Sequence, residues 1–173
     1  MDLQQKIVLT GFMGVGKSSV ARHLACLLDC ERLDLDDVII HNERRAIADI
    51  IKAEGEARFR QIETANLENV LQNLSAPILS LGGGTWTIAE NRRLIKSHGF
   101  ISVWLESTFD HCWQNIKFSR KERPLAASKT QTQRLFEERE KLYCLADWHF
   151  IIKPGFNSYD IANQIAEEVF CKI

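Results

Sequence analysis

The feature that most constrains the fold of this chain is a glycine-rich turn between a short apolar run and a helical pattern. Residues 7–9 are all apolar, which is typical of a strand buried on both faces of a sheet. Residues 17–28 place valine and leucine side chains on one face of a helix. The turn between them reads Gly11-Phe12-Met13-Gly14-Val15-Gly16-Lys17-Ser18, which matches the pattern G-x-x-x-x-G-K-[ST] in full. Motif and context together predict a P-loop.

A P-loop binds the phosphates of a nucleotide. Its glycines let successive backbone N–H groups turn inward around phosphate oxygens, and the helix that follows adds the positive end of its dipole. The Lys17 ammonium is a mobile cation for the β- and γ-phosphates, and the Ser18 hydroxyl is placed to ligate Mg²⁺. The sequence therefore predicts ATP and Mg²⁺ as ligands, with the nucleotide bound by Gly14, Val15, Gly16, Lys17, Ser18 and Ser19.

Beyond this turn, strand-like and helical segments alternate along the chain. Further strands are expected at 32–36, 77–81, 100–105 and 149–152, and further helices at 47–74 with a break near Gly55, at 90–96, from about 108, at 131–145 and at 158–170. Such alternation predicts a single α/β domain over residues 1–173, with a five-stranded parallel sheet and helices on both faces. Residues 117–130 are polar, basic and broken by a proline, so we expect a mobile lid there.

Candidate groups for an acceptor follow two of the predicted strands. Asp34 and Asp36 are two apart in a segment expected to be extended, so both side chains would face the cleft. One carboxylate could then support Mg²⁺ and the other accept the proton of a hydroxyl, although solvated acids at a strand end fit the spacing equally well. Gly82 to Gly84 follow a buried strand and would either let the backbone approach a ligand or form a plain turn. Because parallel strands end at one edge of a sheet, we expect these segments to meet the P-loop.

Composition and missing motifs exclude several classes of protein. The formal net charge of −1 provides no overall field for nucleic acid or an anionic membrane. Five cysteines without a C-x-x-C pair favour reduced thiols in the cytoplasm over disulfides or a zinc site, and five histidines without metal-ligand or triad spacing are expected to be structural or exposed. Neither N-K-x-D nor D-x-x-G occurs, which excludes a GTPase, and 173 residues are too few for an ABC-type ATPase. A small cytoplasmic kinase that acts on a nucleotide or a metabolite, as a monomer, is the expected class.

The motifs, taken in order, resemble those of the shikimate kinase family over nearly the whole chain. Besides the P-loop, the resemblance rests on the pair Asp34 and Asp36 and on Gly-Glu-x-x-Phe-Arg ending at Arg60. It continues with the triple glycine at 82–84, with Arg-Pro-Leu at 123–125, and with Arg139 followed by Leu-Tyr. A P-loop is shared by many families, whereas the other motifs in this order are much more specific. The resemblance implies the P-loop kinase fold and transfer of the γ-phosphoryl group of ATP to the 3-hydroxyl of shikimate, in aromatic amino acid biosynthesis.

The resemblance also implies roles on the acceptor side. Asp36 would contact the acceptor hydroxyl, and Arg60 and Arg139 would hold the carboxylate, although a lone arginine on a helix is otherwise most often solvated. Gly82, with Gly83 beside it, would contact the substrate through its backbone. Two alternatives stay open: a kinase of the same fold for another hydroxylated acid, such as gluconate, and a nucleotide-binding regulatory module without turnover. The triple glycine and the arginines favour a small cyclic carboxylate, and the paired acids favour an enzyme.

On the nucleotide side, the resemblance makes Lys17 and Arg123 catalytic, with Arg123 as the lid arginine on the ATP phosphates. It also makes Asp34 a support for Mg²⁺ beside Ser18. The chain departs from the family pattern on the helix that enters the lid, where the family often has an arginine and this chain has Asn115-Ile116-Lys117. Nucleotide binding is expected to be weaker there unless the lysine of this stretch substitutes.

Overall fold

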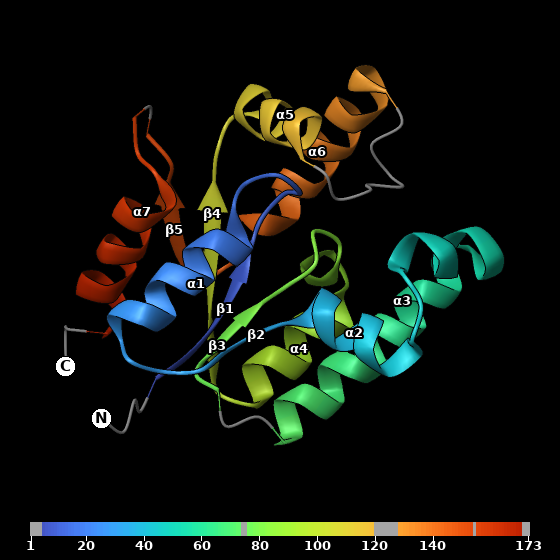
Figure 1. Cartoon of the computed structure of the whole chain (residues 1–173), viewed down its shortest axis with the longest axis horizontal. Helices are drawn as coiled ribbons and strands as arrows, with labels where there is room; N and C mark the ends of the chain where they lie inside the picture. Colours follow the sequence, from blue (N-terminus) through green and yellow to red (C-terminus); the bar gives the residue numbers. More distant parts are fainter. Residues whose placement is uncertain (1–4, 74–75, 120–127, 154, 171–173) are drawn as a thin grey trace.

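A five-stranded parallel sheet forms the middle of the protein in this computed structural model, which describes residues 5–73, 76–119, 128–153 and 155–170 (Figure 1). Every neighbouring pair of strands is parallel, and the spatial order is β2-β3-β1-β4-β5. This confirms the predicted sheet. The strands are β1 (Lys6–Thr10), β2 (Arg32–Asp34), β3 (Ile78–Ser80), β4 (Phe100–Glu106) and β5 (Trp148–Ile151).

Helices cover both faces of the sheet. α1 and α7 pack side by side on one face (Figure 1). α1 leads from β1 to β2, whereas α4 leads from β3 to β4 in the opposite direction, so the right-handed rule for such crossovers puts α4 on the other face. There α4 packs against β4 and α3. The helices are α1 (Lys17–Leu27), α2 (Leu35–Glu43), α3 (Ile47–Asn73), α4 (Ala89–Ser97), α5 (Phe109–Phe118), α6 (Lys129–Tyr143) and α7 (Ser158–Ile165), with a 3₁₀ turn at Thr85–Thr87.

The central position of β1 explains the apolar run near the start of the chain. β1 lies between β3 and β4, and Ile7, Val8 and Leu9 are fully buried. Helices cover both faces of such a strand, so apolar and polar residues do not alternate along it. Leu9 pairs with Ser80 of β3 and with Val103 of β4, so the three strands run in close register. The P-loop therefore leaves the sheet from its most buried strand.

α2 is a helix that the sequence pattern did not reveal. The extended segment expected at 32–36 is wrong from residue 35 onward, because Asp34 ends β2 and caps α2. Asp34 Oδ1 accepts a hydrogen bond from the Asp36 N–H at 3.1 Å, and Leu35 and Ile39 are fully buried. An aspartate cap followed by acids in the first turn stabilises a helix N-terminus. A helix cap, and not alternation along a strand, therefore brings Asp34 and Asp36 together.

Other boundaries are close to those expected. α3 runs across the predicted break at Gly55, which has φ 84° and ψ 163° between two helical halves. The predicted last helix is found as α7 followed by a π-helical turn at Ala166–Phe170. Both ends of the predicted lid are helical, since 117–118 belong to α5 and 129–130 to α6. Arg123 lies outside the described residues, so the lid and its arginine stay predictions.

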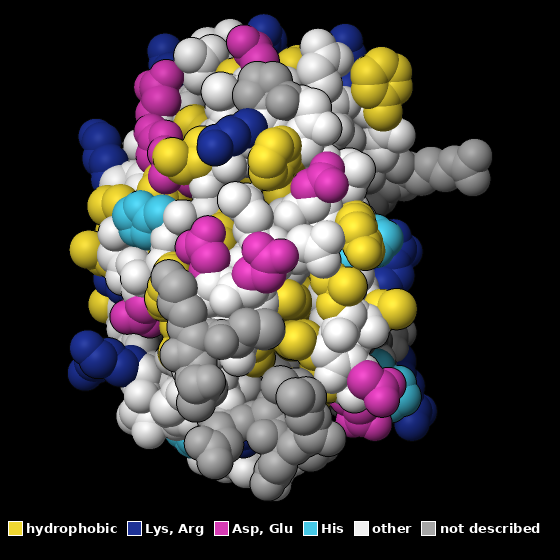
Figure 2. All heavy atoms as spheres, turned by 90° about the vertical axis from the view of Figure 1, so that its left-hand side faces the viewer, with side chains coloured by type: hydrophobic (Ala, Val, Ile, Leu, Met, Phe, Trp, Pro, Cys, Tyr) yellow, Lys and Arg dark blue, Asp and Glu magenta, His cyan; other side chains and the backbone are white. Residues whose placement is uncertain are grey.

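The surface that Figure 2 shows, on the side of α7, carries basic and acidic side chains interspersed with each other. Such mixing agrees with the net charge of −1. Within the described ranges, none of the helices has the length and hydropathy needed to cross a bilayer.

Hydrogen bonds fix the segment between α6 and β5 to the rest of the molecule. Asp147 Oδ2 accepts from the Ser102 N–H at 2.9 Å and from the Ser102 hydroxyl at 2.6 Å, while the Asp147 N–H donates to Ser102 Oγ at 3.0 Å. The Trp86 indole N–H donates to the Leu142 carbonyl at 3.0 Å. The last turn of α6 is therefore held beside β4 and beside the loop that follows β3.

We predict that Asp147→Ala lowers the free energy of unfolding by roughly 1–3 kcal/mol, because it leaves the N–H of the buried Ser102 without its partner, and that Ser102→Ala lowers it by about 0.5–1.5 kcal/mol, because water can reach the exposed Asp147. The double variant should lose less than the sum of the single losses, since the two residues share these bonds. Urea denaturation measures the losses, with Glu138→Ala, which removes an exposed acid of α6, as the control. Strictly additive losses would show that the pair does not act as a unit.

Candidate active site

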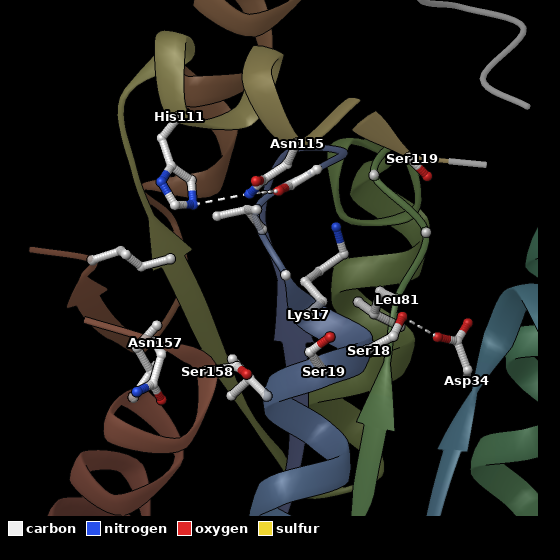
Figure 3. A pocket seen from close by; sticks show the side chains of 18 of the residues that line it. Lys17, Ser18, Ser19, Asp34, Leu81, His111, Asn115, Ser119, Asn157 and Ser158 are labelled. Carbon is white, nitrogen blue, oxygen red and sulfur yellow. Dashed lines mark hydrogen bonds between the residues drawn. The ribbon is translucent and has the colours of Figure 1, made fainter. Parts of the chain in front are cut away.

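A cavity of about 510 Å³ lies at the carboxyl edge of the sheet (Figure 3). Its wall is built by segments that follow all five strands, which confirms that the predicted segments meet at one edge. The size is ordinary for a small-molecule site. The wall includes the six predicted nucleotide-binding residues from Gly14 to Ser19, together with Asp34, Asp36, Gly82 and Gly83.

The P-loop has the backbone that its glycines predict. Gly11, Gly14 and Gly16 have φ of 135°, 81° and 102°, a region that residues with a side chain rarely enter. Lys17 Nζ donates to the carbonyl of Gly11 at 2.8 Å and to that of Phe12 at 3.0 Å. The loop's own carbonyls thus hold the ammonium group inside the turn, where a phosphate group would be placed.

Ser18 and Asp34 offer the oxygen atoms that Mg²⁺ prefers. The Ser18 hydroxyl donates to Asp34 Oδ2 at 2.6 Å, and Asp34 is 7% exposed. The described residues contain no cluster of three or more acidic, histidine or cysteine side chains that could hold a metal. A hydroxyl and one carboxylate fit Mg²⁺ nonetheless, because this ion usually takes few protein ligands and completes its shell with phosphate oxygens and water.

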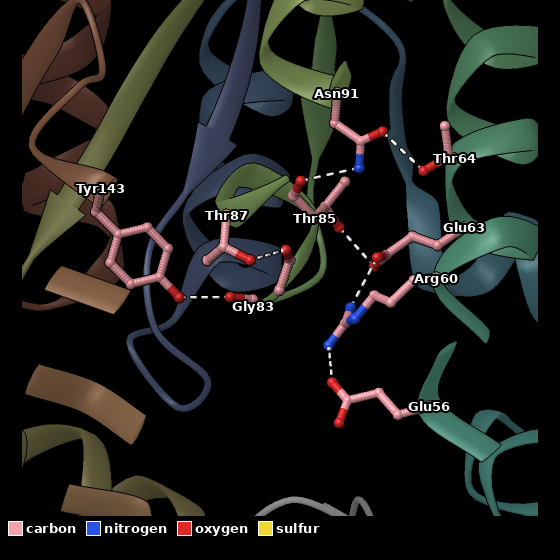
Figure 4. A network of polar contacts seen from close by, with 10 residues as sticks. Glu56, Arg60, Glu63, Thr64, Gly83, Thr85, Thr87, Asn91 and Tyr143 are labelled. Atoms are coloured by element: carbon pink, nitrogen blue, oxygen red, sulfur yellow. Dashed lines mark hydrogen bonds and ion pairs between the residues drawn. The ribbon is translucent and has the colours of Figure 1, made fainter. Parts of the chain in front are cut away.

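A buried ion pair stands at the other end of the site (Figure 4). Arg60 Nη1 lies 2.7 Å from Glu63 Oε2, and Arg60 Nη2 lies 2.9 Å from Glu56 Oε1. Glu63 is 1% exposed, and its second oxygen accepts a hydrogen bond from the Thr85 hydroxyl at 2.6 Å. Burial disfavours the charged guanidinium, but the two carboxylates outweigh it and hold the pKa of Arg60 above its ordinary value. Arg60 therefore stays a cation at this end.

Two residues of the triple glycine, Gly82 and Gly84, lie where an added side chain would meet close neighbours. A Cβ at Gly82 would lie 2.9 Å from Asp36 Oδ1 and 3.0 Å from a Glu63 oxygen. A Cβ at Gly84 would lie 2.3 Å from Arg60 Nη2, closer than any real Cβ contact. None of the three glycines has a positive φ. The acid and the arginine can approach this loop only because it carries no side chains.

Arg139 joins the same loop from α6. Its side chain is 6% exposed, and a Cβ at Gly83 would lie 3.5 Å from Arg139 Nη1. One helical turn later, the Tyr143 hydroxyl donates to the Gly83 carbonyl and also contacts the Arg139 side chain. Burial raises the pKa of Tyr143, and Arg139 only partly opposes this, so the hydroxyl keeps its proton and remains a donor. Asp36, Arg60 and Arg139 thus converge on the triple glycine, although of the three only Asp36 lines the cavity among the described residues.

Several lining residues at the nucleotide end were not expected from the sequence. His111 and Asn115 on α5 form part of the wall (Figure 3). The β5–α7 connection adds residues 152, 156 and 157, and α7 adds its first residue, Ser158. Asn115 Nδ2 donates to the Gly14 carbonyl at 2.8 Å. Lys117, considered as a substitute for the family's arginine, is exposed and is not among the described residues of the wall. The family resemblance pointed to the stretch that begins at Asn115, but no motif assigns this residue to the P-loop, and His111 was expected to be structural or exposed.

Comparisons with known proteins agree with this geometry. The family model for shikimate kinase matches residues 13–170. A shikimate kinase of Streptococcus thermophilus is 42% identical over 139 residues, 79% of this chain and 83% of the relative. One of Persephonella marina is 34% identical over 161 residues, 93% of this chain and 96% of the relative.

Solved structures give the same result. A shikimate kinase of Acinetobacter baumannii, in complex with shikimate, has a TM-score of 0.89 at 31% identity and covers 98% of this chain and 95% of its own. A gluconokinase of Sinorhizobium meliloti has a TM-score of 0.60 at 16% identity, over 95% of this chain and 90% of its own, and this likeness shows a shared fold alone. The P-loop, the capped acid pair and the triple glycine between two arginines thus occur in a chain that belongs to the shikimate kinase family.

Proposed function

We propose that this protein transfers the γ-phosphoryl group of ATP to the 3-hydroxyl of shikimate, with Asp36 as the general base. One observation carries the proposal: an acid and two arginines converge on the triple glycine at one end of a cavity whose other end is a P-loop. We also propose that the protein acts as a monomer, since its predicted site residues all come from one chain, and in the cytoplasm, where ATP is available.

The nucleotide end binds and neutralises phosphate. The N–H groups from Gly14 to Ser19 and the N-terminus of α1 surround the β-phosphate, and Lys17 exchanges loop carbonyls for phosphate oxygens. Ser18 and Asp34 would hold Mg²⁺, which would supply positive charge to offset that of the phosphate groups. Lys17 and the predicted lid residue Arg123 stabilise the charge that develops on the transferred group.

The acceptor end binds the carboxylate of shikimate. Arg60 and Arg139 approach the triple glycine from α3 and α6, so a carboxylate placed there meets two guanidinium groups and can accept bidentate hydrogen bonds. Glu63 keeps the Arg60 guanidinium in place. Gly82 and Gly83 contact the substrate through their backbone.

The reaction is one in-line displacement. Asp36 orients the 3-hydroxyl and accepts its proton while the hydroxyl oxygen forms a bond to the γ-phosphorus. The bond from that phosphorus to the bridging oxygen of ADP breaks in the same step, and its electrons remain on the β-phosphate. The products are shikimate 3-phosphate, ADP and the proton on Asp36, which is later lost to water.

We predict that ADP formation by the purified protein depends on shikimate. In a coupled assay with ATP and Mg²⁺, shikimate should raise turnover far above the rate without an acceptor, and gluconate should not. Preference for gluconate would support the same-fold alternative. Nucleotide binding without turnover on either acid would support a regulatory module.

We predict that Arg60→Ala and Arg139→Ala each raise KM for shikimate by roughly 30-fold or more and change KM for ATP little, because a desolvated carboxylate loses a charged partner. The control is Arg58→Ala, which removes an exposed arginine of α3 two residues from Arg60. The idea fails if calorimetry finds normal shikimate binding in both variants.

We predict that Asp36→Asn lowers kcat by at least about 100-fold while ATP affinity stays close to that of the wild type, because the amide keeps size and hydrogen bonding but cannot accept the proton. Asp37→Asn alters the next acid in the first turn of α2, which is exposed, and should leave kcat unchanged. A kcat within a few fold of wild type would show that Asp36 is not the base. If Asp36→Asn lost affinity for ATP but kept a normal kcat, Asp36 would instead be assigned to Mg²⁺ binding.

A further inference from the structure

We propose that Asn115 is a positioning residue for the nucleotide, and that His111 acts through it. The Asn115 amide holds the Gly14 carbonyl of the P-loop toward α5, and His111 holds the amide in that orientation (Figure 3). This deepens the proposed function, on which it rests, by adding two residues to the ATP site.

The geometry consists of two hydrogen bonds at one nitrogen atom. Asn115 Nδ2 lies 2.8 Å from the Gly14 carbonyl oxygen and 3.0 Å from His111 Nε2. Asn115 and His111 lie one helical turn apart on α5, and all three residues line the cavity. The contact therefore connects the helix after β4 directly to the loop that binds phosphate.

The donors and acceptors in this chain can be assigned from their chemistry. A carbonyl oxygen only accepts, so the atom that Asn115 turns toward Gly14 must be its NH₂ group. The second N–H of that group is then available to the imidazole, and His111 Nε2 must accept it. The His111 tautomer in this arrangement carries its proton on Nδ1. His111 thus fixes which way the amide points.

Gly14 needs such an anchor because glycine restrains its own backbone weakly. Its φ of 81° lies in the region that glycine enters without cost, so the peptide that follows it can rotate easily. A carbonyl rotated toward the cavity would present an acceptor to the phosphate oxygens and weaken binding. α5 already packs tightly on this residue, since a Cβ at Gly14 would lie 2.5 Å from the Cys112 carbonyl oxygen and 2.9 Å from Ile116 Cγ1. The Asn115 amide adds the directional contact that keeps the carbonyl out of the cavity.

Asn115 also accounts for the absence of the arginine that the family often has on this helix. Lys117 is exposed and is not among the described residues of the cavity wall, whereas Asn115 lies in it. In this chain the stretch therefore supports the nucleotide through a neutral amide that fixes the P-loop, and not through a cation that grips the phosphates.

The test compares variants of Asn115 with a neighbour on the same helix. Asn115→Ala should raise KM for ATP and Kd for ADP with Mg²⁺ about fivefold, the effect of one net hydrogen bond, and leave KM for shikimate and kcat within twofold. Asn115→Asp should raise KM for ATP and Kd for ADP further, because a carboxylate cannot donate to the Gly14 carbonyl. Gln114→Ala removes an exposed amide from α5 and should leave all four quantities unchanged. ADP binding is measured by calorimetry and does not depend on the acceptor, so it separates this inference from the identity of the substrate.

Variants of His111 test whether it acts through Asn115. His111→Ala should raise Kd for ADP two- to threefold, and His111→Gln should restore it, because the glutamine oxygen can accept the same N–H. The variant lacking both side chains should bind ADP no more weakly than Asn115→Ala alone. Additive losses would show that His111 contacts the nucleotide independently and would overturn its positioning role. Normal ADP binding by Asn115→Ala would overturn the proposal as a whole. It would also be overturned if this variant bound ATP and shikimate equally more weakly and had a lower unfolding midpoint.

Discussion

The acceptor end of this protein depends on a buried carboxylate. Glu63 is 1% exposed, and a charge so far from water is tolerated only when hydrogen bonds and an opposite charge satisfy it. One of its oxygens accepts a hydrogen bond from Arg60 on the same helix, and the other accepts one from Thr85 in the turn after β3. One side chain thus ties α3 to the loop that carries the triple glycine. Arg60 cannot move away without leaving the buried Glu63 charge with no opposite charge beside it, so the guanidinium stays near the glycines.

A second carboxylate couples the two halves of the site. Asp34 uses one oxygen to cap α2 and the other to accept the Ser18 hydroxyl. The start of α2, which carries Asp36, is thereby fixed relative to the P-loop. The distance between the P-loop and Asp36, the proposed general base, is therefore set by two hydrogen bonds of Asp34 at the sheet edge.

The parts of the site that rest on local backbone chemistry could be predicted from the sequence. The P-loop is one such part, because eight consecutive residues specify both its turn and its ligand. The roles of Asp36, Arg60 and Arg139 rest on the family resemblance, since each residue alone fits a solvated surface, and they stay predictions. The capping of α2 was missed because an aspartate at a strand end and an aspartate at a helix start look alike without the packing of Leu35 and Ile39.

His111 and Asn115 could not have been found in this way. Asn115 meets the Gly14 carbonyl across 101 residues of chain, and the α5 sequence contains no pattern that specifies a partner in the P-loop. The contact exists because β1 and β4 are neighbours in the sheet, which puts the segments that leave them side by side. The contact between Asn115 and Gly14 can therefore be seen only once the order of the strands in the sheet is known.

The close approach of Arg60 to Gly84 limits how the acceptor site can evolve. A Cβ on Gly84 would lie 2.3 Å from Arg60 Nη2, so a side chain there would force the end of the arginine that is proposed to hold the substrate to move. Gly83 has more room, since the nearest atoms to an added Cβ are the Met13 nitrogen at 3.3 Å and Arg139 Nη1 at 3.5 Å. A substitution at Gly84 would therefore act on the α3 side of the acceptor site, whereas one at Gly83 would act on the P-loop backbone and on the α6 side.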